Sequence, residues 1–179
     1  MKKIATLTTH GADNYGAVLQ AYALQKFIGE LGYDCQVINY VPAYTTKEYS
    51  LIRKPKTIKE FAFSCFQLLN YTQRKIRKNR FSAFRDEYLS LSGQTIVDHS
   101  ELIQTVNKYD MVVCGSDQIW NPKMHGFDEA YFLSFDDVST KLVSYAASFG
   151  QDRIDERIKP FLKLYFLRLF HNDQFQIFQ

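Results

Sequence analysis

The sequence predicts an α/β domain in which a mostly parallel β-sheet is flanked by helices, and three observations support this prediction. The first forty residues have the pattern strand, turn, helix, glycine and strand. A short apolar run at 111–114 has the character of a fully buried strand, and further strand and helix candidates follow it. A strand–helix–strand unit requires a crossover between parallel strands. With 179 residues, the chain corresponds to about one domain of ~150 residues and can bury a core of its own.

The first strand–helix–strand unit is bounded by start and stop signals. Residues 4–9 form a β-prone run, and the polar turn 11–16 (GADNYG) follows it. Apolar side chains then recur at the spacing of a helix, at Ala17, Ala21, Leu24, Ile28 and Leu31. Gly32 stands where a helix typically ends, and residues 35–40 return as a second strand, closed by Pro42.

The rest of the chain continues the alternation of helices and strands. The elements expected after Pro42 are an irregular stretch at 43–56, a helix at 57–88, a short helix that Ser100 opens as N-cap, strands at 111–114, 131–133 and 142–144, and a final helix at 151–170. We find no internal repeat.

Composition and charge exclude several classes of protein. A content of 46% hydrophobic and 23% charged residues excludes a disordered chain, and a net charge of +3 is too small to indicate nucleic-acid binding. No run approaches the ~18 apolar residues of a transmembrane segment, and residues 1–10 lack the features of a secretory signal. The three cysteines, Cys35, Cys65 and Cys114, are odd in number and far apart, which argues against a disulfide framework or a zinc site. We therefore expect a cytoplasmic protein.

A basic run on the predicted helix 57–88 has two interpretations. Residues 74–80 carry five positive charges in seven positions, from Arg74 to Arg80. The run is typical of a solvated helix face. Alternatively it binds an anionic partner, such as a phosphorylated lipid carrier, a nucleotide or the inner leaflet of the membrane.

The turn 11–16 is the first of two loops that can carry chemistry, because ligands of open α/β sheets gather beyond the carboxyl ends of the strands. Its backbone N–H groups and the positive end of the following helix can face an anion. The turn matches neither the dinucleotide-binding glycine pattern nor a P-loop. Equally, Asp13 or Asn14 caps the helix while Gly11 and Gly16 relieve backbone crowding.

The second loop, 115–122 (GSDQIWNP), is more specific, and a functional interpretation is favoured here. Asp117 can act as a base or a hydrogen-bond acceptor, and Gln118 and Asn121 can bind hydroxyl groups. Trp120 offers a flat face to a sugar ring. The alternative is that the loop is an ordinary turn and that Trp120 fills the core.

Three motifs resemble those of one known family, in the same order along the chain. Residues 10–25 (HGADNYGAVLQAYALQ) look like the opening motif of the polysaccharide pyruvyl transferase family. Residues 112–122 (VVCGSDQIWNP) are similar to its second signature, and residues 144–150 (SYAASFG) resemble a third. The resemblance implies a Rossmann-like half of a two-domain, glycosyltransferase-B-like architecture. It also implies transfer of the enolpyruvyl part of phosphoenolpyruvate to two sugar hydroxyls, giving a pyruvate ketal on an exopolysaccharide or cell-wall glycan.

The chemistry of this reaction suggests roles for individual residues. Asp117 can serve as the base towards a sugar hydroxyl, and His10 can exchange a proton near neutral pH, although a lone histidine at a strand end is more often structural. The residues expected to bind substrate are Asp13, Asn14, Tyr15, Gly16, Gly115, Ser116, Gln118, Trp120, Asn121 and Ser148. The resemblance implies phosphoenolpyruvate as the donor substrate, and neither a cofactor nor a metal ion is expected.

The resemblance also raises the question of how the chain forms a complete site. It implies a Rossmann-like domain at 1–150, with 151–179 as a helix and tail before a second domain whose basic residues hold phosphoenolpyruvate. Residues 160–170 are apolar on almost all sides, which predicts a helix whose surface is covered by other parts of a protein. Three explanations are considered: the chain is a truncated half of an enzyme, the helix packs on the sheet, or the chain forms a homodimer. The resemblance implies an acceptor that is a glycan or a lipid-linked sugar. The other function considered is a non-catalytic glycan- or nucleotide-binding remnant.

Overall fold

The computed structural model describes residues 1–51, 57, 69–121, 128–135, 138–151, 154, 156–163 and 175–178. Its strands form one five-stranded sheet in the order β2-β1-β3-β4-β5. All four neighbouring pairs run parallel, which confirms the predicted α/β class. The strands are β1 (Lys3–Leu7), β2 (Asp34–Val37), β3 (Met111–Asp117), β4 (Lys141–Ala147) and β5 (Phe175–Phe178).

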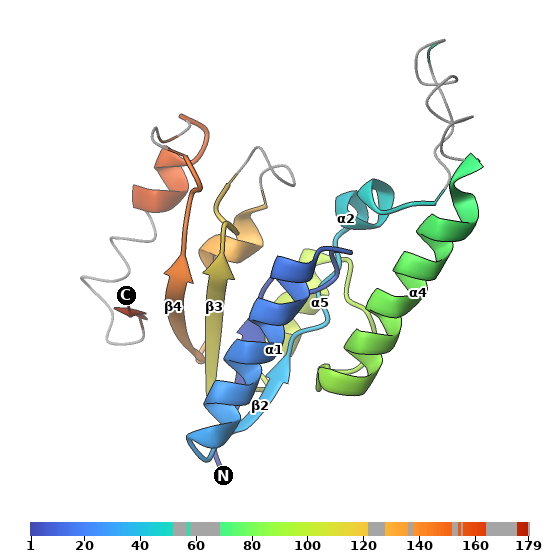
Figure 1. Cartoon of the computed structure of the whole chain (residues 1–179). Helices are drawn as coiled ribbons and strands as arrows, with labels where there is room; N and C mark the ends of the chain where they lie inside the picture. Colours follow the sequence, from blue (N-terminus) through green and yellow to red (C-terminus); the bar gives the residue numbers. More distant parts are fainter. Residues whose placement is uncertain are drawn as a thin grey trace.

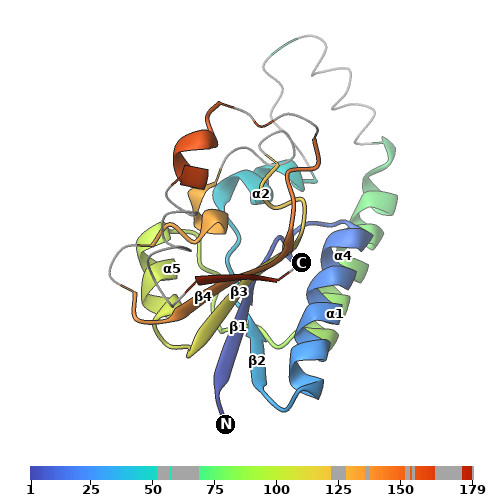
Figure 2. The same cartoon turned by 90° about the vertical axis from the view of Figure 1, so that its left-hand side faces the viewer.

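Helices flank this sheet on both faces. α1 and α4 lie on one side and α5 on the other, and both α1 and α4 begin at the end of the molecule to which β3 and β4 point (Figures 1 and 2). The helical elements are α1 (Tyr15–Glu30), α2 (Ala43–Glu48), α4 (Tyr71–Tyr88), α5 (His99–Val106) and the 3-10 helix η1 (Glu129–Phe132). No helix in the described ranges is long and apolar enough to cross a bilayer.

The alternation of side chains along the strands divides the core into two layers. Val113 and Val143 pack in the cluster that contains Leu24 and Ile28 of α1. Their neighbours in sequence face the other side, because successive residues of a strand point to opposite faces. That second, larger layer includes Ala5, Leu7, Leu102, Val106, Val112, Cys114, Trp120, Phe132, Leu142 and Ile158.

The predicted boundaries of the first helix are confirmed. Asn14 is the N-cap of α1, and its side-chain oxygen accepts a hydrogen bond from the Ala17 N–H at 3.3 Å. Gly32 follows the end of the helix with φ +86°, a conformation that glycine adopts without the steric cost of a Cβ.

Three of the predicted local structures are wrong. Residues 131–133 are not a strand: Tyr131 and Phe132 belong to η1, and a three-residue apolar run cannot distinguish a strand from a buried turn. Part of the stretch 43–56, expected to be irregular, forms α2. The N-cap of α5 is Asp98 and not Ser100, since the Asp98 carboxylate accepts a hydrogen bond from the Ser100 N–H at 2.7 Å.

Two predicted helices are described only in part. Tyr71–Tyr88 confirms the second half of the helix expected at 57–88, while 58–68, with Cys65, lie outside the described residues. Of the final helix expected at 151–170, residues 159–163 are helical, and 164–170 lie outside the described residues. The described residues before 159, namely 151, 154 and 156–158, are not helical, so the predicted start of this helix is wrong.

Candidate functional site

The candidate site lies where the strand order reverses direction. After β1 the chain passes to β2 on one side, and β3 pairs with β1 on the other side. In open parallel sheets this switch point leaves a crevice outside the carboxyl ends of the two strands, where ligands bind. The loop after β1 (residues 8–14, the β1 loop) and the segment from the end of β3 (residues 115–121, the β3 loop) both reach this edge (Figure 1).

Gln20 connects the two loops. Its Nε2 donates to Thr8 Oγ1 at 2.5 Å, and its Oε1 accepts from Ser116 Oγ at 3.1 Å. A primary amide donates and accepts at once, so one side chain of α1 fixes the spacing between the loops. This role of Gln20 was not predicted from the sequence, because residues 20 and 116 come together only in the folded structure.

The β3 loop is locked against the segment 145–150 that follows β4. Gly115 has φ +131°, and a Cβ there would stand 2.0 Å from the Tyr145 carbonyl oxygen. Gly150 has φ +58°, and a Cβ there would stand 2.1 Å from Oε1 of Gln118. The Ser148 N–H donates to the Asp117 carbonyl at 3.0 Å, and the Trp120 N–H donates to the Ser148 carbonyl at 3.2 Å. The second and third motifs are therefore one interlocked structure.

Asp117 is the chemically most available group of the β3 loop. It is partly exposed and adopts φ +88°, a backbone conformation that side-chain-bearing residues rarely take. Its Oδ1 accepts a hydrogen bond from the Gln118 N–H at 2.7 Å. Within the described ranges Oδ2 accepts no hydrogen bond, so it can receive the proton of a bound hydroxyl group.

The other polar side chains of the β3 loop divide into exposed and internal groups. Gln118 is exposed, and its Oε1 accepts a hydrogen bond from the buried Asn121 Nδ2 at 3.0 Å. Ser148 is exposed next to them, while Ser116 is partly exposed and bonded to Gln20. The site therefore presents hydroxyl and amide groups around the Asp117 carboxylate.

The expectation that Trp120 offers its face to a sugar is wrong. Trp120 is 9% exposed, and its ring is stacked on Phe132 with centroids 5.6 Å apart and an interplanar angle of 12°. Its indole N–H donates to the Tyr131 carbonyl at 2.8 Å, and Phe149 covers it with centroids 5.3 Å apart. Trp120 fills the core below the loop, as the alternative interpretation held.

The β1 loop is held by α4. Both terminal nitrogens of Arg85 lie 3.1 Å from Oδ1 of Asp13, and the two side chains are 15% and 11% exposed. Arg77 donates to the Asp13 carbonyl at 3.0 Å. With Asn14 as the helix cap, the polar side chains of this loop are engaged in holding the backbone, whereas Tyr15 and Gly16 stay exposed at the start of α1.

The basic run 74–80 is not simply a solvated face. Arg74 donates to the carbonyls of Ser50 and Leu51, and Lys78 donates to that of Tyr49. Together with Arg77, these side chains tie α4 to the segment after α2 and to the β1 loop. Lys75 and Arg80 are exposed.

His10 is almost completely buried. It is 1% exposed, with Nδ1 3.3 Å from the Thr8 carbonyl and Nε2 3.2 Å from Asn39 Oδ1. Burial lowers the pKa of His10 despite these two acceptors, so the neutral ring is favoured. A proton-transfer role that requires contact with a bound sugar does not fit this burial, and the structural alternative does.

A second polar cluster, which was not predicted from the sequence, connects the segment after β2, α2 and the start of η1. The hydroxyls of Tyr40 and Tyr44 donate to Oδ2 of Asp128 at 2.9 and 3.0 Å, while its Oδ1 caps η1 by accepting from the Ala130 N–H. Burial, followed by the nearby Asp128 carboxylate, raises the pKa of Tyr40. Because Tyr40 and Asp128 are far apart in sequence, no local sequence pattern predicts the cluster. In the described part of the chain, no group of three or more His, Cys, Asp or Glu residues could hold a metal ion.

The comparisons with known proteins agree with the motifs. Residues 14–172 match the family model described as polysaccharide pyruvyl transferase. The match begins at Asn14, the cap of α1, and includes the β3 loop and the segment 145–150. Neither a curated protein nor a solved structure matches the chain.

Proposed function

The chain belongs to the polysaccharide pyruvyl transferase family, and we propose that it transfers the enolpyruvyl group of phosphoenolpyruvate to two hydroxyls of a glycan sugar, forming a pyruvate ketal. The observation that carries the proposal is the position of Asp117. Its carboxylate lies at the switch point of the sheet, and Oδ2 accepts no hydrogen bond within the described residues.

The proposed reaction balances without a redox step. Protonation of C3 of phosphoenolpyruvate makes C2 electrophilic, and two sugar oxygens form bonds to C2 while the bond from C2 to the phosphate oxygen breaks. Of the two hydroxyl protons released, one replaces the proton delivered to C3 and the other leaves with inorganic phosphate. The chain must therefore accept protons from the sugar hydroxyls and donate one to C3.

Asp117 is the proposed base. A carboxylate within hydrogen-bond distance of a hydroxyl can take its proton as the oxygen attacks, and Oδ2 is the available atom. Gln118 and Ser148, both exposed beside it, are proposed to bind further hydroxyls of the same sugar. His10 and Trp120 are left out of this proposal because both are buried.

The donor requires positive charge that the β1 and β3 loops do not freely offer. Phosphoenolpyruvate carries a phosphate and a carboxylate, whereas Arg85 is paired with Asp13 and Arg77 is bonded to the β1 loop. We propose that the described domain binds mainly the acceptor, and that a second domain or a second copy supplies cations for the donor.

The test is acceptor-dependent phosphate release by the purified full chain, using phosphoenolpyruvate and a panel of nitrophenyl glycosides, with the ketal identified by mass spectrometry. Release should require both substrates. The variant Asp117→Asn should lower the rate by about 100-fold or more, the usual contribution of a positioned base. Asp34→Asn makes the same chemical change at the opposite, amino-terminal edge of the sheet and should leave the rate unchanged.

Two results would contradict the proposal. One is release that Asp117→Asn does not affect, which would move the base elsewhere. The other is a folded chain that binds a glycoside in saturation-transfer NMR but releases no phosphate with any acceptor, even when the second domain is supplied as a separate chain. That second result would support the alternative function, a non-catalytic glycan-binding protein.

A further inference from the structure

A small cationic cavity lies where α4 meets the β1 loop and the segment after α2 (residues 49–51). Its volume is about 150 Å³, below the range of roughly 300–1,000 Å³ typical of small-molecule sites. A cavity of this size suits a small ion better than a sugar or a nucleotide. The lining residues are Asp13, Tyr49, Leu51, Arg74, Arg77 and Lys78 (the α4 cavity).

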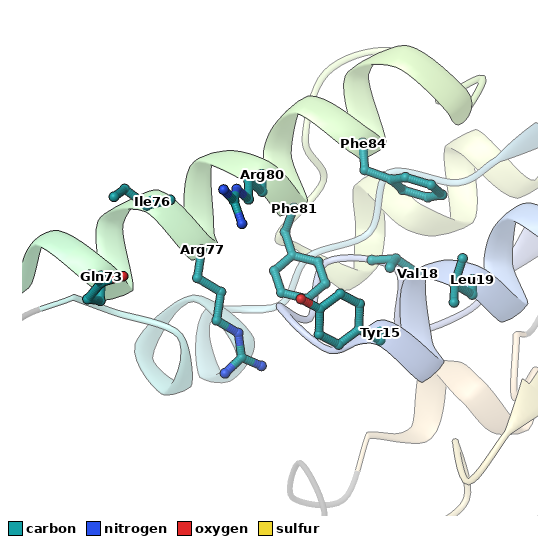
Figure 3. Close-up of a pocket in the computed structure, with 9 residues that line it drawn as sticks. All are labelled: Tyr15, Val18, Leu19, Gln73, Ile76, Arg77, Arg80, Phe81 and Phe84. Atoms are coloured by element: carbon teal, nitrogen blue, oxygen red, sulfur yellow. The ribbon is translucent and has the colours of Figure 1, made fainter. Parts of the chain in front are cut away.

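All three cations of the α4 cavity come from one helix. Arg74, Arg77 and Lys78 follow the spacing i, i+3 and i+4, which places them on one side of α4. Arg74 and Lys78 are partly buried. Figure 3 shows the side chain of Arg77 extending from α4 towards the start of α1, beside Tyr15. The cavity therefore collects the part of the basic run 74–80 that faces the rest of the protein.

Each of these cations is held in place by backbone carbonyls. Arg74 donates to the carbonyls of Ser50 and Leu51 at 3.0 and 2.7 Å. Arg77 and Lys78 each donate to one carbonyl, at 3.0 and 3.2 Å. A guanidinium has five N–H donors and an ammonium group has three, so every one of these side chains keeps donors for a ligand. The carbonyls fix the positions of the cations without neutralising their charge.

The positive charge of the cavity is not balanced within the described part of the chain. Asp13 is the one acidic residue among the described lining residues, and its carboxylate is paired with Arg85 at 3.1 Å. No described carboxylate forms an ion pair with Arg74, Arg77 or Lys78. Cations gathered in a partly buried cavity repel one another, and a bound anion relieves this repulsion. Guanidinium and ammonium groups together suit the oxygens of a phosphate ion.

From the size of the cavity and its uncompensated charge, we propose that the α4 cavity binds free inorganic phosphate, held by charge-assisted hydrogen bonds from Arg74, Arg77 and Lys78. Bound phosphate strengthens the attachment of α4 to the β1 loop, because Arg77 also donates to the Asp13 carbonyl. The inference rests on the proposed function only for the source of the ligand, since that reaction releases phosphate. Binding itself requires no turnover.

The test is calorimetric titration of the full chain with sodium phosphate, without phosphoenolpyruvate or sugar and at an ionic strength held constant with sodium chloride. Saturable binding is expected. Loss of one charge-assisted contact in Arg74→Gln or Lys78→Gln should weaken phosphate binding by about tenfold. Lys78→Arg keeps the positive charge and its N–H donors and should recover most of the affinity.

Lys75→Gln is the matched control. Lys75 is exposed on the same helix but does not line the cavity, so this variant loses the same charge and should change the affinity for phosphate by less than about twofold. Arg74 and Lys78 also tie α4 to residues 49–51, so their glutamine variants are expected to be less stable. Circular dichroism verifies that each variant is folded at the temperature of the titration.

Three results would overturn the proposal. The first is a folded wild-type chain that shows no saturable binding of phosphate. The second is an equal loss of affinity in Lys78→Gln and Lys75→Gln, which would mean general charge attraction. The third is that phosphoenolpyruvate or glucose 1-phosphate, titrated separately, binds more than about tenfold more tightly than phosphate and loses this affinity in Lys78→Gln. That result would assign the cavity to a phosphorylated substrate. Because these titrations need no turnover, each result is separate from a failure of the phosphate-release assay.

Discussion

The two loops at the switch point are built by different means. The β1 loop is held by polar contacts: Arg85 and Arg77 reach across from α4, and Asn14 closes the helix end. The β3 loop is held by close packing. A Cβ at Gly115 would clash with the Tyr145 backbone, and a Cβ at Gly150 would clash with the side chain of Gln118.

This difference explains which loop retains free chemistry. In the β1 loop the side chains that could act on a ligand are consumed in holding the loop. In the β3 loop, backbone contacts hold the loop in place, and one carboxylate oxygen of Asp117 accepts no hydrogen bond in the described structure. The first loop is therefore expected to contribute mainly to stability, and the second carries the base of the proposed reaction.

The largest expected effect is on folding, in Gly115→Ala. A Cβ 2.0 Å from the Tyr145 carbonyl, at φ +131°, should lower the free energy of unfolding by about 3 kcal/mol or more, through a clash and backbone strain together. Gly93→Ala is the control, because Gly93 has φ +116° but open space around its Cβ position. Urea unfolding of both variants separates the clash from the strain. Equal losses would contradict the steric account of the β3 loop.

Next in size is Asp13→Asn in the β1 loop. The change leaves the largely buried guanidinium of Arg85 without its ionic partner and should lower the free energy of unfolding by about 2 kcal/mol, between the values for exposed and buried pairs. The control is Asp86→Asn, which removes an exposed carboxylate next to Arg85 in the sequence and should leave the free energy of unfolding almost unchanged. If the two variants lose the same amount in chemical denaturation, the β1 loop is not held by this ion pair.

His10 should make stability depend on pH in one direction. Burial lowers its pKa below the ordinary value of 6.5, so the unfolded chain binds this proton more readily than the folded chain. The stabilisation that the neutral His10 ring contributes is present above about pH 6.5 and is lost as the pH falls below this value. As the pH is lowered from about 7.5 to 5.5, the free energy of unfolding should decrease more steeply for the wild type than for His10→Gln. Parallel profiles would show that His10 is not buried as a neutral ring.

A smaller effect is expected at the helix cap. Asn14→Ala removes the acceptor for the Ala17 N–H and should cost about 1 kcal/mol of unfolding free energy. Asn14→Ser, which restores a capping oxygen, should recover most of this loss. Thermal unfolding of the two variants measures the difference. An alanine variant as stable as the serine variant would show that the Asn14 cap does not stabilise the protein.

The parallel sheet and the first helix could be predicted because their signals are local. The spacing of apolar residues from Ala17 to Leu31, the cap at Asn14 and the stop at Gly32 all act within one helix. The strand character of 111–114 is equally local. The three motifs identified the family, and they mark the loops that the sheet brings to one edge.

The errors and omissions arise where contacts distant in sequence decide. The burial of Trp120 depends on Phe132 and Phe149, and that of His10 on Asn39. In the sequence alone, Trp120 and His10 are each as compatible with a ligand site as with the protein core. The bridge from Gln20 to Ser116 and the pairing of Asp128 with two tyrosines have no signature at all in the sequence, because the sheet alone brings these residues together.

The most direct test of this account exchanges one carboxylate for an amide in each loop and compares acceptor-dependent phosphate release per folded molecule. Asp117→Asn should abolish most of the activity while leaving stability nearly unchanged. Asp13→Asn should lower stability but, at a temperature where it remains folded, retain activity close to that of the wild type. Loss of activity in folded Asp13→Asn with an active Asp117→Asn would contradict the account and place the chemistry in the β1 loop.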